Sequence, residues 1–220
     1  ISLQTLDEIA ELAATSPEMH DMVQYKLDDL VGKKFAEKLL ASAEYRRSLG
    51  ELSQSLAGKL GEKGPMIMSE RTLKDLIVVQ ETLGSNARDM ISALDLNNFT
   101  DQMDYIESDS VISVGLASFD LSSGELQDSL VKMGISFDLK DKEERAEISR
   151  IFSRITEKQP DGTQKTVKRV KHELFEVPNS LKANGLAAHV TRESLKQYDV
   201  MSMDEIVLHA DIDMGAYAWA

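Results

Sequence analysis

The order of elements expected over the last fifty residues constrains the fold most. Residues 170–178 read as a strand, residues 182–187 contain a glycine and open a helix, and residues 205–213 read as a second strand. Glycine at such a turn lets backbone N–H groups approach an anion closely, and the helix N-terminus adds a partial positive charge. This order of strand, turn, helix and strand predicts an α/β unit suited to anion binding.

Composition excludes several classes of protein. Hydrophobic residues make up 42% of the 220 positions, which is enough for a packed core, and no apolar run approaches the roughly 20 residues of a membrane span. Cysteine is absent, so disulfides, thiolate metal sites and cysteine nucleophiles are excluded. The four histidines lack metal-ligand spacing, so no metal site is expected.

Charge is distributed unevenly along the chain. The net charge is −13, and most of the excess acidic side chains fall within residues 1–134. A nucleic-acid-binding protein needs a basic face, so we expect no nucleic acid on the acidic N-terminal half. A solvated, self-repelling helical surface is expected there instead.

Helix start signals dominate the first hundred residues. Thr5-Leu6-Asp7-Glu8 is a capping box and predicts a helix from Thr5 to about Ala14. Ser16-Pro17-Glu18 combines an N-cap, a proline at the first helical position and an acid near the dipole, which predicts a second helix. The pattern predicts four or five helices in a bundle or an elongated arm. Further start and stop signals fall at Ser69-Glu70, at Gly84, and at Ser85 or Asn86.

The pattern changes after Asn97-Asn98. Residues 110–119 are β-branched and apolar on both faces, which predicts a buried strand. Ser122-Ser123-Gly124-Glu125 is a capping box and predicts a helix to Met133, followed by a short strand over 135–139. Asp141-Lys142-Glu143-Glu144 begins a charged helix, but its end is ambiguous because residues 148–155 fit a helix or a strand.

Pro160-Asp161-Gly162 marks a turn, because proline presets φ and glycine tolerates positive φ. The flanking residues, 150–158 and 164–177, therefore form an antiparallel hairpin. The expected class is α+β, with a helical region over 1–108 and a mixed sheet with flanking helices over 109–220.

The segment from about Arg150 to Ala220 resembles the GNAT-like (N-acyltransferase fold) domains embedded in large bacteriophage proteins, including virion-associated ones. The resemblance covers about a third of the chain. It lies in the hairpin at Pro160-Asp161-Gly162, in residues 172–178, in residues 182–187, at Tyr198 and in residues 209–220.

The resemblance implies a pyrophosphate loop and acetyl-CoA or another acyl-CoA as the cofactor. The family loop reads Arg/Gln-x-x-Gly-x-Gly/Ala, and this chain has Lys182-x-x-Gly185-x-Ala187. The alternative is a helix start that needs glycine only for tight packing on the sheet. Candidate cofactor-binding residues are Val177, Lys182, Ala183, Asn184, Gly185, Leu186 and Ala187.

Catalytic residues are sparse. His172 and Glu173 lie on the strand before the loop, where the family often has a base, and they face opposite sides of that strand. The alternative for both is a solvated strand surface. By family spacing Trp219 stands where the general-acid Tyr is expected, and Tyr217 points elsewhere on a helix.

A local basic run contains Lys165, Lys168, Arg169 and Lys171. One interpretation is attraction of the 3′-phosphate of coenzyme A or of a nucleic-acid backbone. The interpretation we favour is an exposed sheet edge that charge protects against aggregation.

These expectations combine into a functional hypothesis. Because the chain starts at Ile1 and lacks the Gly-Phe that the family has after the equivalent of Ala220, we expect a truncated portion of a large phage protein. Its role would be structural or in assembly, with an inert GNAT-like module, in the virion or the host cytoplasm. Its partners would be other virion proteins or the rest of the parent polypeptide.

The alternative is an acyl-CoA-dependent N-acyltransferase acting on an amine. A third reading, a helical adaptor with an unrelated α+β end, requires that residues 165–177 and 205–213 are not neighbouring strands.

Overall fold

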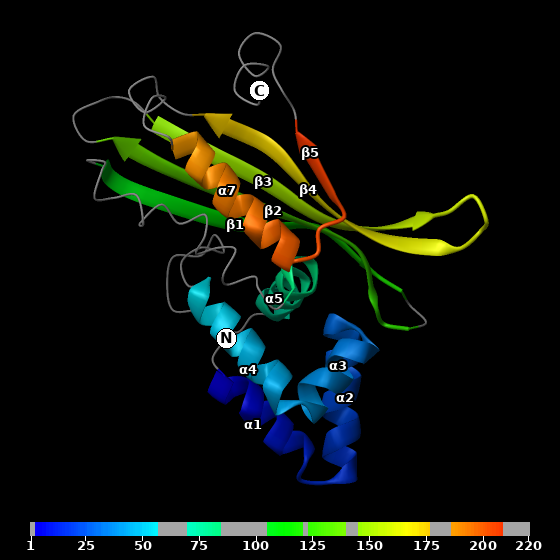
Figure 1. The fold of residues 1–220 in the computed structure, drawn as a ribbon. Coiled ribbons are helices and arrows are strands. Elements are labelled where there is room, and N and C mark those ends of the chain that lie inside the picture. Colours follow the sequence, from blue (N-terminus) through cyan, green and yellow to red (C-terminus); the bar gives the residue numbers. More distant parts are fainter. Residues whose placement is uncertain are drawn as a thin grey trace.

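The computed structural model describes residues 3–56, 70–84, 105–120, 123–139, 145–176 and 186–208. Helices come first, followed by four strands, another helix and a short strand, so the class is α+β as predicted (Figure 1). The predicted helix after Ser85 or Asn86 lies outside the described residues. The N-terminal helices are α1 (Leu3–Ala13), α2 (Pro17–Val31), α3 (Lys33–Ala41), α4 (Ala43–Ser55) and α5 (Glu70–Leu83).

Capping explains where these helices begin. The Ser16 side chain accepts a hydrogen bond from the backbone N–H of Met19 at 3.1 Å, and Pro17 follows it, which confirms the predicted start of α2. The predicted start at Thr5 is wrong, because α1 already begins at Leu3. Gln4 donates to Glu8 at 3.0 Å, and such an i,i+4 contact supports the helix upstream of Thr5.

Helix α5 connects the helical region to the sheet. Leu76, Ile77, Val78 and Val79 are all fully buried, so this helix is enclosed on every side. It packs against α2 and α4 on one side and against β1, β2 and β3 on the other. The helices and the sheet therefore share one hydrophobic core, and a division at residues 108 and 109 falls inside β1.

The sheet described in the structure has five strands in the order β1-β2-β3-β4-β5. The first four are antiparallel neighbours, whereas β5 runs parallel to β4 and is reached through α7. Because β4 and β5 are neighbours, the alternative of a helical adaptor with an unrelated α+β end is wrong, since it required that these two segments are not neighbouring strands. The bounds are β1 (Tyr105–Phe119), β2 (Leu126–Leu139), β3 (Arg145–Lys158), β4 (Gln164–Glu176), α7 (Leu186–Val200) and β5 (Glu205–Leu208).

The helix predicted from Ser122 to Met133 is wrong, because residues 126–133 belong to β2. The predicted start of the charged helix, residues 141–144, lies outside the described residues, and residues 148–155 take the strand alternative within β3. The Ser123 and Gly124 backbone N–H groups bond to Asp120, so this apparent capping box makes the turn between β1 and β2. Buried Val131 and Met133 alternate with exposed Lys132, which is the two-residue period of a strand. The hairpin at Pro160-Asp161-Gly162 is confirmed, and so is the strand over 110–119. The predicted burial of that strand is wrong, because β1 stands at one end of the described strand order and Gly115 is exposed.

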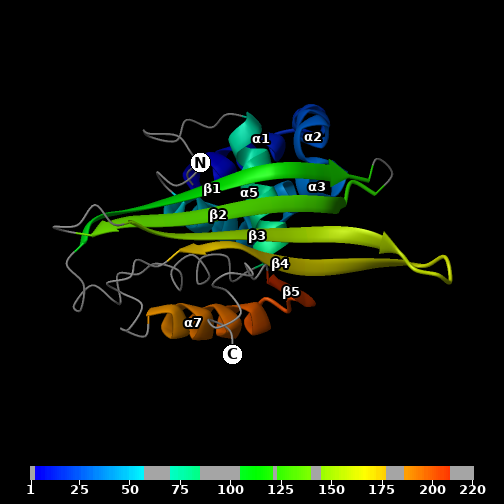
Figure 2. The same ribbon diagram turned by 90° about the horizontal axis from the view of Figure 1, so that it is seen from above.

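Both α5 and α7 lie on the same face of the sheet. Val131, Phe152 and Val170 are register partners and so point to one side. Phe152 contacts the α7 residue Tyr198 on that side, and Figure 2 shows α5 near β1 and β2 with α7 beside β4 and β5. We call this side the helix face. The opposite face carries polar and charged side chains such as Lys132 and Glu173, as expected for an antiparallel sheet that is solvated on one side.

Candidate functional site

A β-bulge in β4 shapes the predicted catalytic region. Arg150 pairs with His172, but the preceding Ser149 pairs with Leu174, so Glu173 is an extra residue in the ladder. The bulge shifts the alternation of side chains by one residue. His172 and Phe175 therefore both point to the helix face, although they are three residues apart.

Arg150 lies at the centre of this region and has no exposed surface. Its Nη1 donates to the carbonyl oxygens of Ser149 and Leu174, at 3.0 and 3.1 Å, and so holds the two strands together at the bulge. Its Cζ lies 5.7 Å from the centroid of the Phe175 ring. Nε and Nη2 are buried with no hydrogen-bond partner among the described residues. Burial lowers the pKa of Arg150, and the neighbouring Tyr198 acts in the opposite direction.

His172 packs against α7 and is almost completely buried. Its Nε2 lies 2.9 Å from the hydroxyl of Tyr198, and the two rings meet edge to face. Burial lowers the pKa of His172 to about 3, and the positive charge of Arg150 adds to the effect. The imidazole is therefore neutral at pH 7. Burial also raises the pKa of the Tyr198 phenol.

Glu173 lies on the opposite, solvated face. Its Oε2 is 2.5 Å from Nζ of Lys132 and accepts a hydrogen bond from Ser149 Oγ at 3.0 Å. The hydrogen bonds from Lys132 and Ser149 lower the pKa of this carboxyl group. The prediction that His172 and Glu173 face opposite sides of one strand is confirmed.

Most of the predicted cofactor segment lies outside the described residues, namely Val177, Lys182, Ala183, Asn184 and Gly185, and the same holds for Tyr217 and Trp219. Leu186 begins α7, and Ala187 is exposed in its first turn. Because β4 and β5 are parallel and α7 connects them, the carboxyl ends of both strands and the N-terminus of α7 belong to one βαβ unit.

The basic run does not form one basic surface. Lys168 points to the helix face, whereas Arg169 and Lys171 point to the opposite face. Arg169 is ion-paired with Glu205 at 2.6 Å and with Glu157 at 3.3 Å. The favoured interpretation of a protected sheet edge is wrong for Arg169 and Lys171, because they pair with β5, whereas Lys165 lies before the part of β4 that β5 covers.

Sequence reasoning missed the central role of Arg150. An arginine inside an amphipathic pattern is normally expected in solvent, and nothing local to residues 148–152 reveals the bulge opposite it. Tyr198 entered only as one residue of the resembling segment. Its approach to His172 depends on how α7 crosses the sheet, which becomes visible only in three dimensions.

Comparison of this chain with family models, with curated proteins and with solved structures gave no match. Within the described ranges there is no group of three or more His, Asp or Glu side chains arranged to hold a metal ion. None of the helices in those ranges has the length and apolar character needed to cross a membrane.

Proposed function

We propose that this chain is a structural or assembly component associated with a bacteriophage virion, and that its GNAT-like part is catalytically inert. The phage setting rests on the resemblance of residues 150–220. Its partners are then other virion proteins or the rest of the parent polypeptide. The inertness rests on the environment of His172, which, of the two predicted bases, is the one that points to the helix face.

A general base for an amine works best when its pKa is near the operating pH. His172, with a pKa of about 3, attracts a proton too weakly for that role at neutral pH. Its Nε2 is also occupied by the Tyr198 hydroxyl. Glu173 is held by Lys132 on the other side of the sheet. These contacts favour a structural role for both side chains.

Isothermal titration of the chain with acetyl-CoA tests the inert module. We expect no heat of binding. Micromolar binding that disappears in Gly185→Trp but persists in Ala41→Trp would overturn the proposal. Ala41 is an exposed residue at the end of α3, so its substitution adds the same indole outside the β4-α7-β5 unit.

Immunodetection tests the virion association separately. Antibodies raised against the chain should detect it in purified particles of the source phage after salt washing. Detection only in the soluble fraction of infected cells would contradict a structural role in the virion, whether or not the module binds a coenzyme.

The second candidate is an acyl-CoA-dependent N-acyltransferase, and the parallel β4-α7-β5 unit favours it. In parallel α/β sheets, ligands bind at the carboxyl ends of the strands, and helix N-termini there attract phosphate groups. Residues 182–187 would hold the coenzyme, with His172 or Glu173 as the base. Product formation from acetyl-CoA and a panel of polyamines and peptides, reduced in His172→Gln or Glu173→Gln, would support this candidate. Absence of turnover would count against it.

A further inference from the structure

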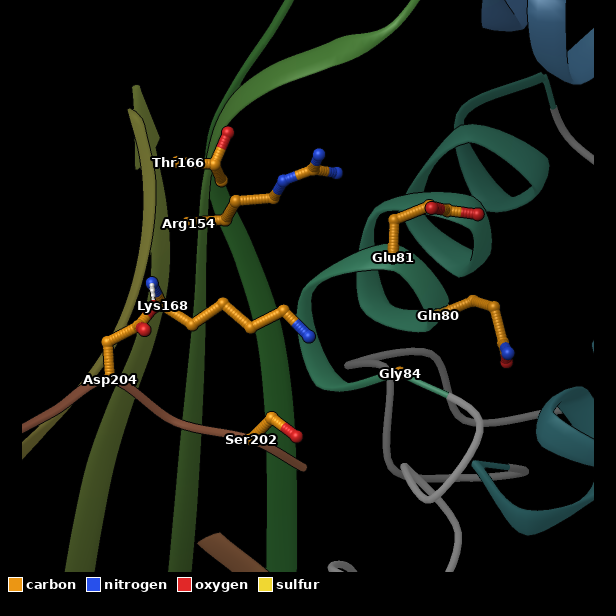
Figure 3. Close-up of a pocket in the computed structure, with 8 residues that line it drawn as sticks. All are labelled: Gln80, Glu81, Gly84, Arg154, Thr166, Lys168, Ser202 and Asp204. Carbon is orange, nitrogen blue, oxygen red and sulfur yellow. Dashed lines mark hydrogen bonds between the residues drawn. The ribbon is translucent and has the colours of Figure 1, made fainter. Parts of the chain in front are cut away.

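An open pocket of about 500 Å³ lies between the C-terminal end of α5 and the start of β4 (Figure 3). Its walls come from α5, from β3 and β4, and from the turn after α7. Lys168, in one wall, is eight residues before the end of β4, or about 25 Å along the strand. The pocket therefore lies away from the carboxyl end of β4.

Two cationic side chains enter this pocket side by side. Arg154 and Lys168 are register partners on β3 and β4, and both extend from the sheet toward α5 (Figure 3). Like charges on directly opposed strand residues repel each other. Arg154 Nε is buried with no hydrogen-bond partner in the described part of the chain. Among the described residues, Lys168 Nζ has a long hydrogen bond of 3.4 Å to the carbonyl oxygen of Met201.

The carboxylates near these cations are engaged elsewhere. Asp204 Oδ2 accepts the backbone N–H of Lys168 at 2.8 Å, where it continues the pairing of β4 with β5. Glu81 points away from Arg154, toward Tyr45 and Lys38 (Figure 3). Glu125, whose pKa Arg154 helps to lower, forms an ion pair with Lys34. The lining therefore carries two cations and two carboxylates, and the side chains that point between the sheet and α5 without a close carboxylate partner among the described residues are the cations Arg154 and Lys168 (Figure 3).

We propose that the pocket binds the phosphate group of a small phosphorylated molecule between Arg154 and Lys168. A guanidinium offers several donors in a fixed plane and an ammonium adds a point charge, and both suit phosphate oxygens. The hydroxyls of Thr166 and Ser202 line the same pocket and add further donors. Phosphate has more acceptor oxygens than a carboxylate, so it can accept hydrogen bonds from more of these four side chains. The volume, typical of small-molecule sites, leaves room for the organic part.

Ser202 adds a conformational observation. It has φ of 53°, the one positive φ at a non-glycine residue among those described. It ends α7 in the position that glycine usually takes, with the N–H of Met203 bonded to the Tyr198 carbonyl oxygen. A serine held in this region carries strain. Its hydroxyl lies in the pocket wall (Figure 3), so the turn that ends α7 places a hydrogen-bond donor at the pocket.

NMR titration of the full chain with inorganic phosphate, at constant ionic strength set with sodium chloride, tests the proposal. We expect saturable shifts of the amide signals of Gly84, Lys168 and Asp204. Arg154→Gln and Lys168→Gln should each weaken binding at least tenfold. Lys171→Gln makes the same charge change on the opposite face of β4 and should leave the affinity unchanged. Acetate should produce much weaker shifts than phosphate.

Three results would overturn the proposal. The first is the absence of saturation. The second is that Lys171→Gln weakens phosphate binding as much as Arg154→Gln and Lys168→Gln do, which would indicate diffuse attraction to the surface. The third is an affinity for acetate equal to that for phosphate. Ser202→Ala keeps the net charge and adds no bulk at the positive φ, so it covers the case in which a charge variant fails to fold. It should weaken phosphate binding severalfold, and an unchanged affinity would contradict a site at this wall.

Discussion

The hydroxyl oxygens of Thr82 and Ser129 lie 2.6 Å apart in the buried interface between α5 and β2. Thr82 Oγ1 also lies 2.6 Å from the carbonyl oxygen of Val78, to which it can donate. This pair is a polar link between the helical region and the sheet. Removing one hydroxyl leaves the other group buried without that partner.

We therefore expect Thr82→Val to lower the free energy of unfolding by about 1–3 kcal/mol, the cost of an unsatisfied buried group. Ser129→Ala should cost less, because Thr82 Oγ1 can still donate to the Val78 carbonyl oxygen, and the double variant should cost less than the sum of the two. Urea denaturation measures all three. Thr15→Val, which removes an exposed hydroxyl bonded to Leu12, is the control and should change stability by less than about 0.5 kcal/mol. Strict additivity would show that the two hydroxyls are not coupled.

Gly124, in the turn between β1 and β2, lies directly against the start of α3. A Cβ at this position would come within 2.7 Å of the Lys33 backbone nitrogen and 2.9 Å of the Lys34 nitrogen, and φ is +65°. Gly124→Ala should destabilise the protein by roughly 3 kcal/mol, because backbone strain and steric overlap add. Thermal unfolding measures the loss.

Gly162 is the matched control for that substitution. Its φ is +84°, but nothing lies within 4 Å of an added Cβ. Gly162→Ala should therefore cost only about 1 kcal/mol, from backbone strain alone. Equal losses in the two variants would mean that the turn does not press against α3.

Local chemistry explains which elements the sequence predicts well. The turn at Pro160-Asp161-Gly162 and the start of α2 at Ser16 depend on residues only a few positions apart. The Asp161 side chain accepts the N–H of Thr163 at 2.9 Å, which fixes the turn without help from distant residues. Such local signals therefore predict the turn and the helix start correctly.

Tertiary pairing decided the elements that were predicted wrongly. Residues 122–133 fit a capped helix locally, yet Val131 becomes a strand residue because Phe152 and Val114 pair with it from both sides. The contacts of buried Arg150 could not be predicted from the sequence for the same reason. The position of Arg150 depends on the bulge in β4 and on α7, which are distant in sequence.

The depressed pKa of His172 predicts a specific dependence of stability on pH. The folded protein holds this imidazole neutral down to about pH 3, whereas the unfolded chain protonates it near 6.5. Between these values the unfolded state binds more protons, so stability falls as pH falls, by up to about 1.4 kcal/mol per pH unit. Urea denaturation at several pH values should show a shallower slope from pH 6 to pH 4 in His172→Gln than in the wild type. His20→Gln removes an exposed imidazole and should keep the wild-type slope.

Arg150 and His172 are coupled electrostatically, and a substitution that removes the charge of Arg150 tests that coupling. Arg150→Met keeps an unbranched side chain in the buried site but removes the positive charge that disfavours protonation of His172. The pKa of His172 should rise but stay below 6.5, because burial, the larger cause, remains. Titration of the histidine ring protons by NMR measures the shift. Arg169→Met, which removes a charge from the opposite face, should leave the pKa of His172 unchanged. If Arg150→Met also leaves it unchanged, the two side chains do not share one buried environment, and the bulge does not bring them together on the helix face.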